Sequence, residues 1–168
     1  LGADRFDMVS LGQEVLAPYA KPDANGAPLF QLPGKPGQPL PYLAYAEGAY
    51  LGQMVDLILK GAPAAIHLDR VYETDMAEGL KAMALEGHGV AFLPHSAVQN
   101  ELLAHKLVSA LPPELASMQI TMEVRAYRER PHITEQHRPG AAPQRVPATD
   151  APHSAQALWD YLRASRTD

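Results

Sequence analysis

The sequence contains no cysteine in its 168 residues. This absence excludes disulfide frameworks, thiolate metal sites and cysteine-based redox switches. The sequence also has no apolar run long enough to cross a bilayer, and its first residues lack the basic and then apolar pattern of a secretory signal. We therefore expect a cytoplasmic protein that does not contact a membrane.

An excess of positive charge is absent as well. The sequence has 14 lysine and arginine residues against 19 aspartate and glutamate residues, which gives a formal net charge of −5. A free-standing nucleic-acid-binding domain normally carries a basic patch or stripe. The charge therefore argues against DNA binding by this chain, although it does not exclude a partner domain that binds DNA. Hydrophobic residues at 46% and charged residues at 20% are ordinary values for a globular domain with a buried core.

Signatures of catalysis and of metal binding are missing too. No G-x-S-x-G nucleophile elbow occurs, and the seven histidines form no H-E-x-x-H or comparable ligand spacing. His132 and His137 lie in a proline-rich stretch, where a surface position is the simpler interpretation. We therefore expect no enzymatic activity, no cofactor and no metal ion.

Residues 73–94, ETDMAEGLKAMALEGHGVAFLP, predict a helix followed by a buried strand. Asp75 and Glu78 form an N-terminal capping pair, with Thr74 as the competing cap. Gly87 follows the helix as a left-handed C-terminal cap would, and residues 90–93 are an unbroken apolar run. Because the glycines follow the helix rather than precede it, they do not predict a phosphate-binding loop. The apolar stripe of this helix consists of Met76, Leu80, Met83 and Ala84.

Strand and helix patterns alternate over most of the chain. A capping box is expected at Ser96 and Gln99, and a proline- and glycine-rich loop over residues 19–41. This alternation predicts an α/β fold with a parallel-rich sheet flanked by helices. The predicted elements are one or two short strands over 6–18, strands over 42–46 and 66–73, and helices over 48–60 and from Ser96 onward.

The pattern changes after about residue 110. Residues 118–127 alternate apolar and polar side chains, which predicts a strand with one solvated face. Residues 130–152 contain five prolines and no apolar period, so we expect a mobile segment there. A final helix would cover an apolar surface with Ala155, Leu158, Trp159 and Leu162.

Polar residues follow three of the predicted strands. If these strands are parallel, the turns at residues 46–49, 73–75 and 93–96 emerge at one edge of the sheet and line a cleft. Backbone N–H groups at helix starts would suit a small polar effector, neutral or singly charged. Alternatively, Glu47 only stabilises a helix start and His95 is a solvent-exposed turn residue. The candidate effector-binding residues are Glu47, Gly48, Ala49, Glu73, Thr74, Asp75, Pro94 and His95.

Two segments carry a family resemblance: LPYLAYAEGAYLGQMVDLILK (40–60) and HLDRVYETDMAEGLKAMALEGHGVAFLPHSAV (67–98). In both the family and this sequence, a strand leads to a helix, and a second strand leads to a glutamate and small polar residues. A second helix, a glycine-x-glycine, an apolar strand and Leu-Pro follow. Because these features occur in the same order, residues 6–128 resemble the effector-binding, or substrate-binding, domain of LysR-type transcriptional regulators. The matching residues are Glu73-Thr74-Asp75, Gly87-His88-Gly89 and Leu93-Pro94.

The resemblance implies a periplasmic-binding-protein-like (type 2) two-lobed fold with the effector in the cleft between the lobes. Residues 15–115 look like the second lobe, and 118–127 like the strand that returns towards the first. An N-terminal winged helix-turn-helix and most of the first lobe do not appear in this sequence, which begins at Leu1, so we expect a piece of a longer protein. The implied division is residues 1–128 as the effector-binding domain, 129–153 as a mobile segment and 154–168 as a helix packing on the first lobe.

The function implied by the resemblance is ligand sensing. A small-molecule effector would control transcription through a homo-oligomer, a dimer or tetramer, that contacts DNA only through the N-terminal domain. Two alternatives remain open. One is a solute-binding protein of the same fold. The other is an oxidant-responsive regulator, in which methionine would be the only sulfur-containing residue available for oxidation.

Overall fold

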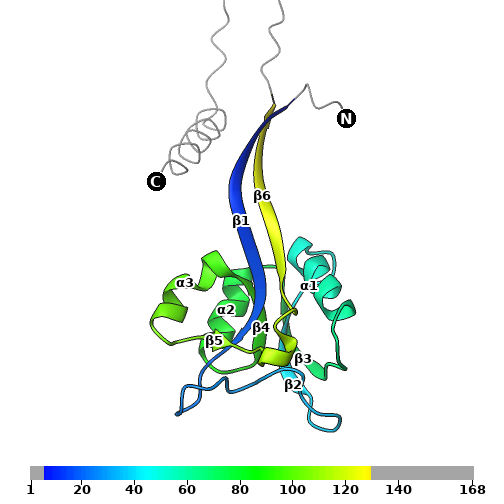
Figure 1. The fold of residues 1–168 in the computed structure, drawn as a ribbon, viewed down its shortest axis with the longest axis vertical. Coiled ribbons are helices and arrows are strands. Elements are labelled where there is room, and N and C mark those ends of the chain that lie inside the picture. Colours follow the sequence, from blue (N-terminus) through cyan, green and yellow to red (C-terminus); the bar gives the residue numbers. More distant parts are fainter. Residues whose placement is uncertain (1–5, 130–168) are drawn as a thin grey trace, which may run out of the picture. The chain divides into compact units, whose positions relative to one another are not determined.

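The structure, a computed structural model, describes residues 6–129 (Figure 1). The predictions for residues 130–152 and for the final helix lie outside this range. None of the described helices is long and apolar enough to cross a membrane. The strands are β1 (Phe6–Ala20), β2 (Leu40–Tyr45), β3 (Leu68–Thr74), β4 (Val90–Pro94), β5 (Val108–Ser109) and β6 (Ile120–Glu129). The helices are α1 (Tyr50–Lys60), α2 (Ala77–Leu85), α3 (His95–Leu103) and the short 3-10 helix η2 (Pro113–Leu115).

The strands form one mixed sheet with the order β3-β2-β4-β1-β5, and β6 also pairs with β1. Strand β2 is parallel to β3 and to β4, whereas β1 is antiparallel to β4 and to β5. The predicted α/β fold with a parallel-rich sheet is therefore confirmed, and its parallel part is β3-β2-β4. The expectation of one or two short strands at the start is corrected to one strand of 15 residues. Gly12 takes a φ of 108° without ending that strand.

The described residues fall into two compact units. One unit is Gln13–Met122, which contains the range that the family resemblance assigns to the second lobe. The other contains the described residues 6–12 and 123–129, which belong to β1 and β6. Within this smaller unit, Nη2 of Arg128 lies 3.3 Å from Oδ2 of Asp7.

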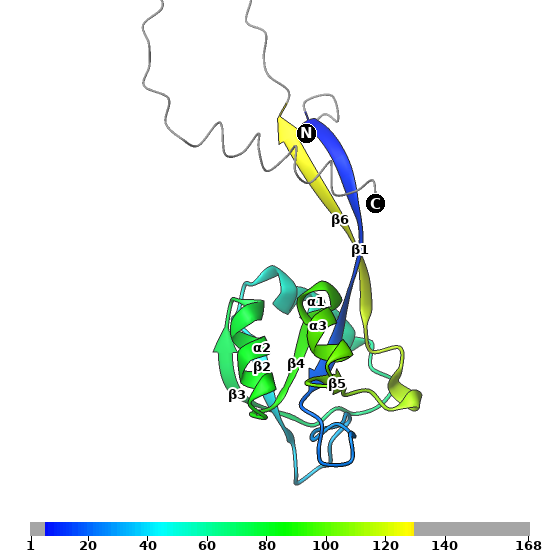
Figure 2. The same cartoon turned by 90° about the vertical axis from the view of Figure 1, so that its left-hand side faces the viewer.

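Helices cover both faces of the sheet in the unit Gln13–Met122. The connection through α1 leads from β2 outward to the edge strand β3, and the connection through α2 crosses back over β2 to β4. Because such crossovers are right-handed, α1 lies on one face of the sheet and α2 on the other. Helix α3 packs beside α2, where Nζ of Lys81 lies 2.7 Å from Oε1 of Glu101 (Figures 1 and 2).

Strand β4 lies in the hydrophobic core. Its first four residues have no exposed area, which confirms the buried strand predicted from the apolar run at residues 90–93. The ring of Phe92 meets the ring of Tyr42 edge to face, with centroids 6.2 Å apart. The hydroxyl of Tyr45 donates a 2.8 Å hydrogen bond to the backbone oxygen of Phe92. Side chains therefore tie β2 to β4 in addition to their parallel pairing.

The start of α2 differs from the prediction. Its N-cap residue is Met76, which makes no side-chain capping hydrogen bond. Instead, Oγ1 of Thr74 accepts a 3.3 Å hydrogen bond from the backbone N–H of Met76. The predicted Asp75–Glu78 capping pair is wrong because the helix begins one residue later than that pair requires. Met76 is also 64% exposed, so it does not belong to the buried stripe that contains Leu80.

The end of α2 confirms the predicted glycine cap. Gly87 has a φ of 84°, and its N–H donates a 3.0 Å hydrogen bond to the oxygen of Ala84. The N–H of His88 donates a 3.1 Å bond to the oxygen of Met83, which completes the paired bonds of a left-handed cap. Gly89 has a different role, because a Cβ atom there would lie 2.5 Å from the backbone oxygen of Pro41. The second glycine thus permits a close approach of β4 to β2.

Candidate effector-binding site

The parallel strands β2, β3 and β4 bring three polar turns to one edge of the sheet. Because the three strands point the same way, the residues that follow them emerge at the same side. Glu47, Gly48 and Ala49 join β2 to α1, and Thr74 ends β3 immediately before Asp75. Pro94 ends β4, and His95 begins α3.

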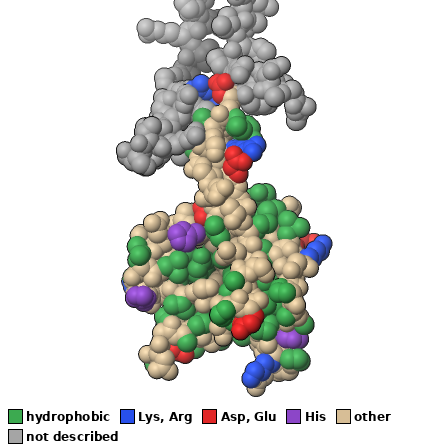
Figure 3. All heavy atoms as spheres, viewed as in Figure 1, with side chains coloured by type: hydrophobic (Ala, Val, Ile, Leu, Met, Phe, Trp, Pro, Cys, Tyr) green, Lys and Arg blue, Asp and Glu red, His purple; other side chains and the backbone are tan. Residues whose placement is uncertain are grey.

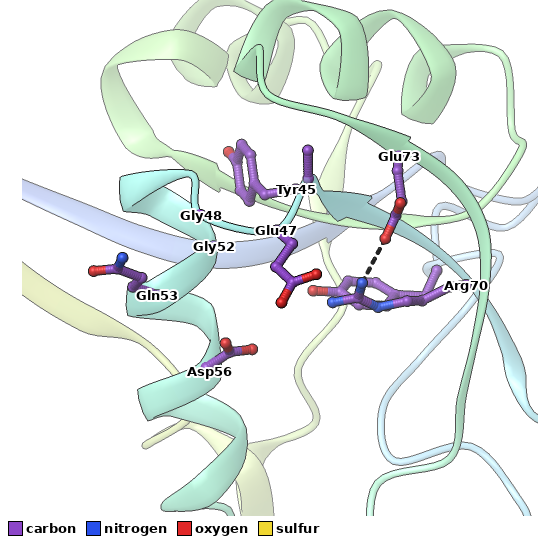
Figure 4. A pocket seen from close by; sticks show the side chains of 10 residues that line it. Tyr45, Glu47, Gly48, Gly52, Gln53, Asp56, Arg70 and Glu73 are labelled. Atoms are coloured by element: carbon purple, nitrogen blue, oxygen red, sulfur yellow. Dashed lines mark hydrogen bonds and ion pairs between the residues drawn. The ribbon is translucent and has the colours of Figure 1, made fainter.

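A cavity of about 350 Å³ lies between α1 and the strands β2 and β3 (Figure 4). It brings together Glu47, Gly48 and Glu73 of the sequence-predicted set. The other five predicted residues do not line it, so this cavity unites two of the three turns and not all of them. Its lining residues are Tyr42, Tyr45, Ala46, Glu47, Gly48, Gly52, Gln53, Asp56, Arg70 and Glu73.

A bulge in β3 places two charged side chains of this cavity on one face. Tyr42 pairs with Arg70, but the next residue of β2, Leu43, pairs with Tyr72, so Val71 is an extra residue in the edge strand. Strand residues three apart normally point to opposite faces, and one extra residue cancels that alternation. Nη1 of Arg70 accordingly lies 2.5 Å from Oε1 of Glu73, as the dashed line in Figure 4 shows.

The start of α1 shapes the other wall of the cavity. Gly48 takes a φ of 85° in the turn after β2, and the N–H of Ala49 closes that turn on the oxygen of Ala46 at 3.2 Å. Gly52 allows the helix to approach β2, since a Cβ atom there would lie 3.1 Å from Cβ of Tyr45. Glu47 and Asp56 then project across the cavity towards Arg70 on β3 (Figure 4).

Carboxylates dominate the charge of this cavity. Glu47, Asp56 and Glu73 face a single guanidinium, that of Arg70, so the lining carries a formal excess of two negative charges. Burial raises the pKa of Tyr42 to about 12, with Arg70 opposing and Asp56 adding to the shift. The Tyr42 hydroxyl therefore stays protonated at neutral pH. Sequence patterns did not indicate Arg70 or Asp56, although the four-residue spacing of Gly52 and Asp56 places them on the same helix face.

The third turn is organised separately, around the start of α3. Pro94 is the N-cap residue, and the capping box expected at Ser96 and Gln99 is wrong. A carboxylate from β1 takes its place: Oε1 of Glu14 accepts a 3.0 Å hydrogen bond from the backbone N–H of Ser96, and Oε2 accepts one from the Ser96 hydroxyl. No sequence signal identifies Glu14, because it lies far from Ser96 in the chain.

Glu14 supplies a negative charge at this helix start. Burial acts to raise the pKa of Glu14, but hydrogen bonds from the side chain and backbone of Ser96 outweigh it and hold the pKa below its ordinary value. A carboxylate at a helix N-terminus is stabilised by the helix dipole. A carboxylate of the protein itself therefore already occupies the start of α3, so the backbone N–H of Ser96 is not free for an effector.

Within residues 6–129, no group of three or more histidine, aspartate or glutamate side chains is arranged to hold a metal ion. Figure 3 shows one face of the described part of the chain. On this face the lysine and arginine side chains lie scattered rather than in one basic patch. The observed features are thus a mixed α/β sheet, a carboxyl edge with three polar turns, and a polar cavity at that edge. Together they define the class of α/β domains with a polar cavity at the carboxyl ends of parallel strands.

The family follows from a direct comparison. A family model described as the LysR substrate binding domain matches residues 3–137. The chain belongs to this family, and it is a regulatory domain of a LysR-type transcriptional regulator rather than an enzyme. LysR regulatory domains bind small-molecule effectors.

Known relatives agree with this assignment. The chain is 33% identical over 124 residues to the HTH-type transcriptional regulator YjiE of Escherichia coli (strain K12), covering 73% of this chain and 38% of YjiE. It is 32% identical over 124 residues to the HTH domain-truncated transcriptional regulator QseD of Escherichia coli O157:H7, covering 73% of this chain and 48% of QseD. The matched part therefore spans less than half of either relative.

Solved structures show the same fold. The apo regulatory domain of HypT from Salmonella typhimurium superposes with a TM-score of 0.70 at 23% identity, covering 96% of this chain and 66% of that one. The full-length HypT structure is described as that of a hypochlorite-specific LysR-type transcriptional regulator. At this identity the likeness concerns the fold.

Proposed function

We propose that this domain senses a small polar molecule in the cytoplasm and thereby controls transcription through a DNA-binding domain outside these 168 residues. The observation that carries the proposal is the polar cavity between the β2–α1 turn and β3, at the carboxyl end of parallel strands. Open α/β sheets bind ligands at this edge. The effector would act by binding two conformations of the regulator with different affinities, because only such a difference shifts their populations.

The proposed effector-binding residues are those of the three turns, namely Glu47, Gly48, Ala49, Glu73, Thr74, Asp75, Pro94 and His95. Glu47, Gly48 and Glu73 are supported by the cavity that they line. The remaining residues are supported only by their position at the same sheet edge. The effector itself would be neutral or singly charged, since the cavity is too acidic to accept a highly charged anion.

The test is thermal unfolding of the full-length protein against a panel of metabolites, because a ligand that binds the native state raises its stability by mass action. We expect Glu47→Ala to weaken the stabilisation, with Thr74→Ala and His95→Ala weakening it as well. Glu86→Ala and His88→Ala are matched controls, since these exposed residues lie between α2 and the amino end of β4. If the three edge variants keep the affinity of the wild type, the effector binds elsewhere.

We also propose that the full-length regulator is a dimer or tetramer. Strand β3 is an edge of the sheet, and its side chains Val71 and Tyr72 are 52% and 37% exposed. Exposed apolar groups of this kind on an edge strand are characteristic of association surfaces. Light scattering should give a mass of two or four subunits, reduced by Val71→Glu. A strictly monomeric wild type would contradict this proposal.

An oxidant response through methionine is the second candidate function. It is favoured by Met76, which is 64% exposed at the start of α2, where conversion to the polar sulfoxide needs no opening of the core. Met118, which is 1% exposed, serves as the internal control. After limited hypochlorite treatment, peptide mass spectrometry should find Met76 oxidised well before Met118. A promoter response to hypochlorite that survives Met76→Leu would exclude this residue as the sensor.

A further inference from the structure

We propose that the cavity between α1 and β3 binds an organic cation, an ammonium group attached to a short hydrocarbon chain. This inference rests on the proposed effector site and adds the chemical class of its ligand. It depends on the charge of the lining residues, on how these residues are paired, and on an apolar neighbour of the cavity.

The charges of the cavity are only partly compensated. Arg70 pairs with Glu73 at 2.5 Å and thus neutralises one of the three carboxylates. Glu47 and Asp56 have no ion-pair partner among residues 6–129. Both project into the cavity from the side of α1 (Figure 4). A cation between them would gain two carboxylate partners, whereas an anion would meet repulsion from both.

Two neutral groups of the lining suit the same ligand. The hydroxyl of Tyr42 keeps its proton, because burial raises its pKa to about 12, and its oxygen can accept a hydrogen bond from an ammonium group. Aromatic rings also attract cations, and the guanidinium of Arg70 already lies 6.0 Å from the centroid of the Tyr42 ring. The volume of about 350 Å³ falls within the range of small-molecule sites, roughly 300–1,000 Å³.

A second cavity, of about 460 Å³, adjoins the first and shares Tyr42 and Arg70 with it. Its other lining residues are apolar: Leu59, Ala64, Ala65, Ile66 and Leu68. A hydrocarbon chain placed there would be removed from water and would contact an apolar wall, which is favourable. A ligand with its ammonium group beside Glu47 and Asp56 and its chain passing Tyr42 would use both cavities. We therefore expect affinity for amines to rise with chain length.

Four probes separate the contributions of charge and chain: n-hexylammonium, ethylammonium, n-hexanol and hexanoate, each titrated calorimetrically into the 168-residue chain at one ionic strength. Hexylammonium should bind more tightly than each of the others. Hexanoate or hexanol binding as tightly as hexylammonium would overturn the assigned charge, and equal binding of ethylammonium would overturn the role of the chain.

Substitutions of the cavity-lining residues provide a second test. The double variant Glu47→Gln/Asp56→Asn should weaken hexylammonium binding about ten-fold, the combined effect of two solvent-accessible ion pairs. The control Glu78→Gln/Glu114→Gln removes the same number of charges from exposed positions outside the cavity and should leave the affinity within about two-fold, because distant surface charges are screened. Equal losses in the two double variants would overturn the site.

A promoter assay with the full-length regulator separates this inference from the proposed function. If some small molecule changes promoter activity but hexylammonium fails the calorimetric tests, the sensing function stands and the ligand class is wrong. If hexylammonium binds as described, but neither it nor any metabolite of the panel used for thermal unfolding alters transcription, the ligand class is supported and the sensing function fails.

Discussion

Gly87 and Gly89 are separated by a single residue, yet we expect their replacement to destabilise the fold for different reasons. A Cβ atom at Gly89 would lie 2.5 Å from the oxygen and 3.0 Å from the carbon of the Pro41 backbone, and 3.1 Å from Cγ of Leu43. Backbone atoms cannot rotate away, so β4 and β2 must separate where Tyr42 pairs with Val90. Overpacking of this kind costs up to about 3 kcal/mol. Gly89→Ala should then lower Tm by up to roughly 6–12 °C.

An added Cβ at Gly87 meets only side chains, those of Lys21 and Leu29, but the backbone conformation is unfavourable. Its φ of 84° lies in the left-handed region, and the nearest atom to an added Cβ is Cδ of the flexible Lys21 side chain at 3.3 Å. Gly87→Ala should therefore cost about 1–2 kcal/mol. Gly87→Asn should cost less, because asparagine tolerates this conformation. At position 89 the order reverses, because the larger asparagine clashes more than alanine does.

Urea unfolding followed by circular dichroism gives the free energy of unfolding of all four variants. The comparison requires that the slope of this free energy against urea concentration is the same in each variant. The reasoning fails if Gly89→Ala is as stable as the wild type, or if asparagine is no better than alanine at position 87. Either result would mean that the backbone between α2 and β4 adapts more easily than the close approach to Pro41 indicates.

Two further predictions concern single hydrogen bonds. Tyr45→Phe removes the 2.8 Å bond to the oxygen of Phe92 and leaves that buried oxygen without the hydroxyl, so urea unfolding should show a loss of about 1 kcal/mol; unchanged stability would contradict a role for this bond. Glu14→Gln should destabilise the domain at pH 7, because the lowered pKa of Glu14 means that its carboxylate stabilises the fold. That contribution is fully present above the ordinary glutamate pKa of about 4.3 and is lost as the pH falls through the lowered pKa of the folded state. Thermal unfolding of the wild type and of Glu14→Gln between pH 7 and pH 3 should therefore show that their difference in Tm becomes smaller as the pH falls. A difference in Tm that does not depend on pH would argue against stabilisation by the Glu14 carboxylate.

Local patterns of sequence were sufficient for the elements whose causes are local. The unbroken apolar run at residues 90–93 predicts a strand buried on both faces, as β4 is. Gly87 predicts a helix end, because the left-handed cap depends only on the preceding turn. The order of strands and helices also predicts that three polar turns share one edge, since parallel strands leave no other arrangement. By contrast, the starts of α2 and α3 were predicted wrongly, because several neighbouring polar residues compete as caps.

The cavity and the anchoring of α3 were decided by tertiary structure. Arg70 and Glu73 share a face only because Val71 is an extra residue opposite β2, and strict alternation along the strand would separate them. Glu14 reaches Ser96 only because β1 runs antiparallel beside β4, with Leu16 opposite Pro94. A sequence specifies its local turns through neighbouring residues, whereas strand register and bulges depend on packing between distant segments. The chemistry of this site depends on that register.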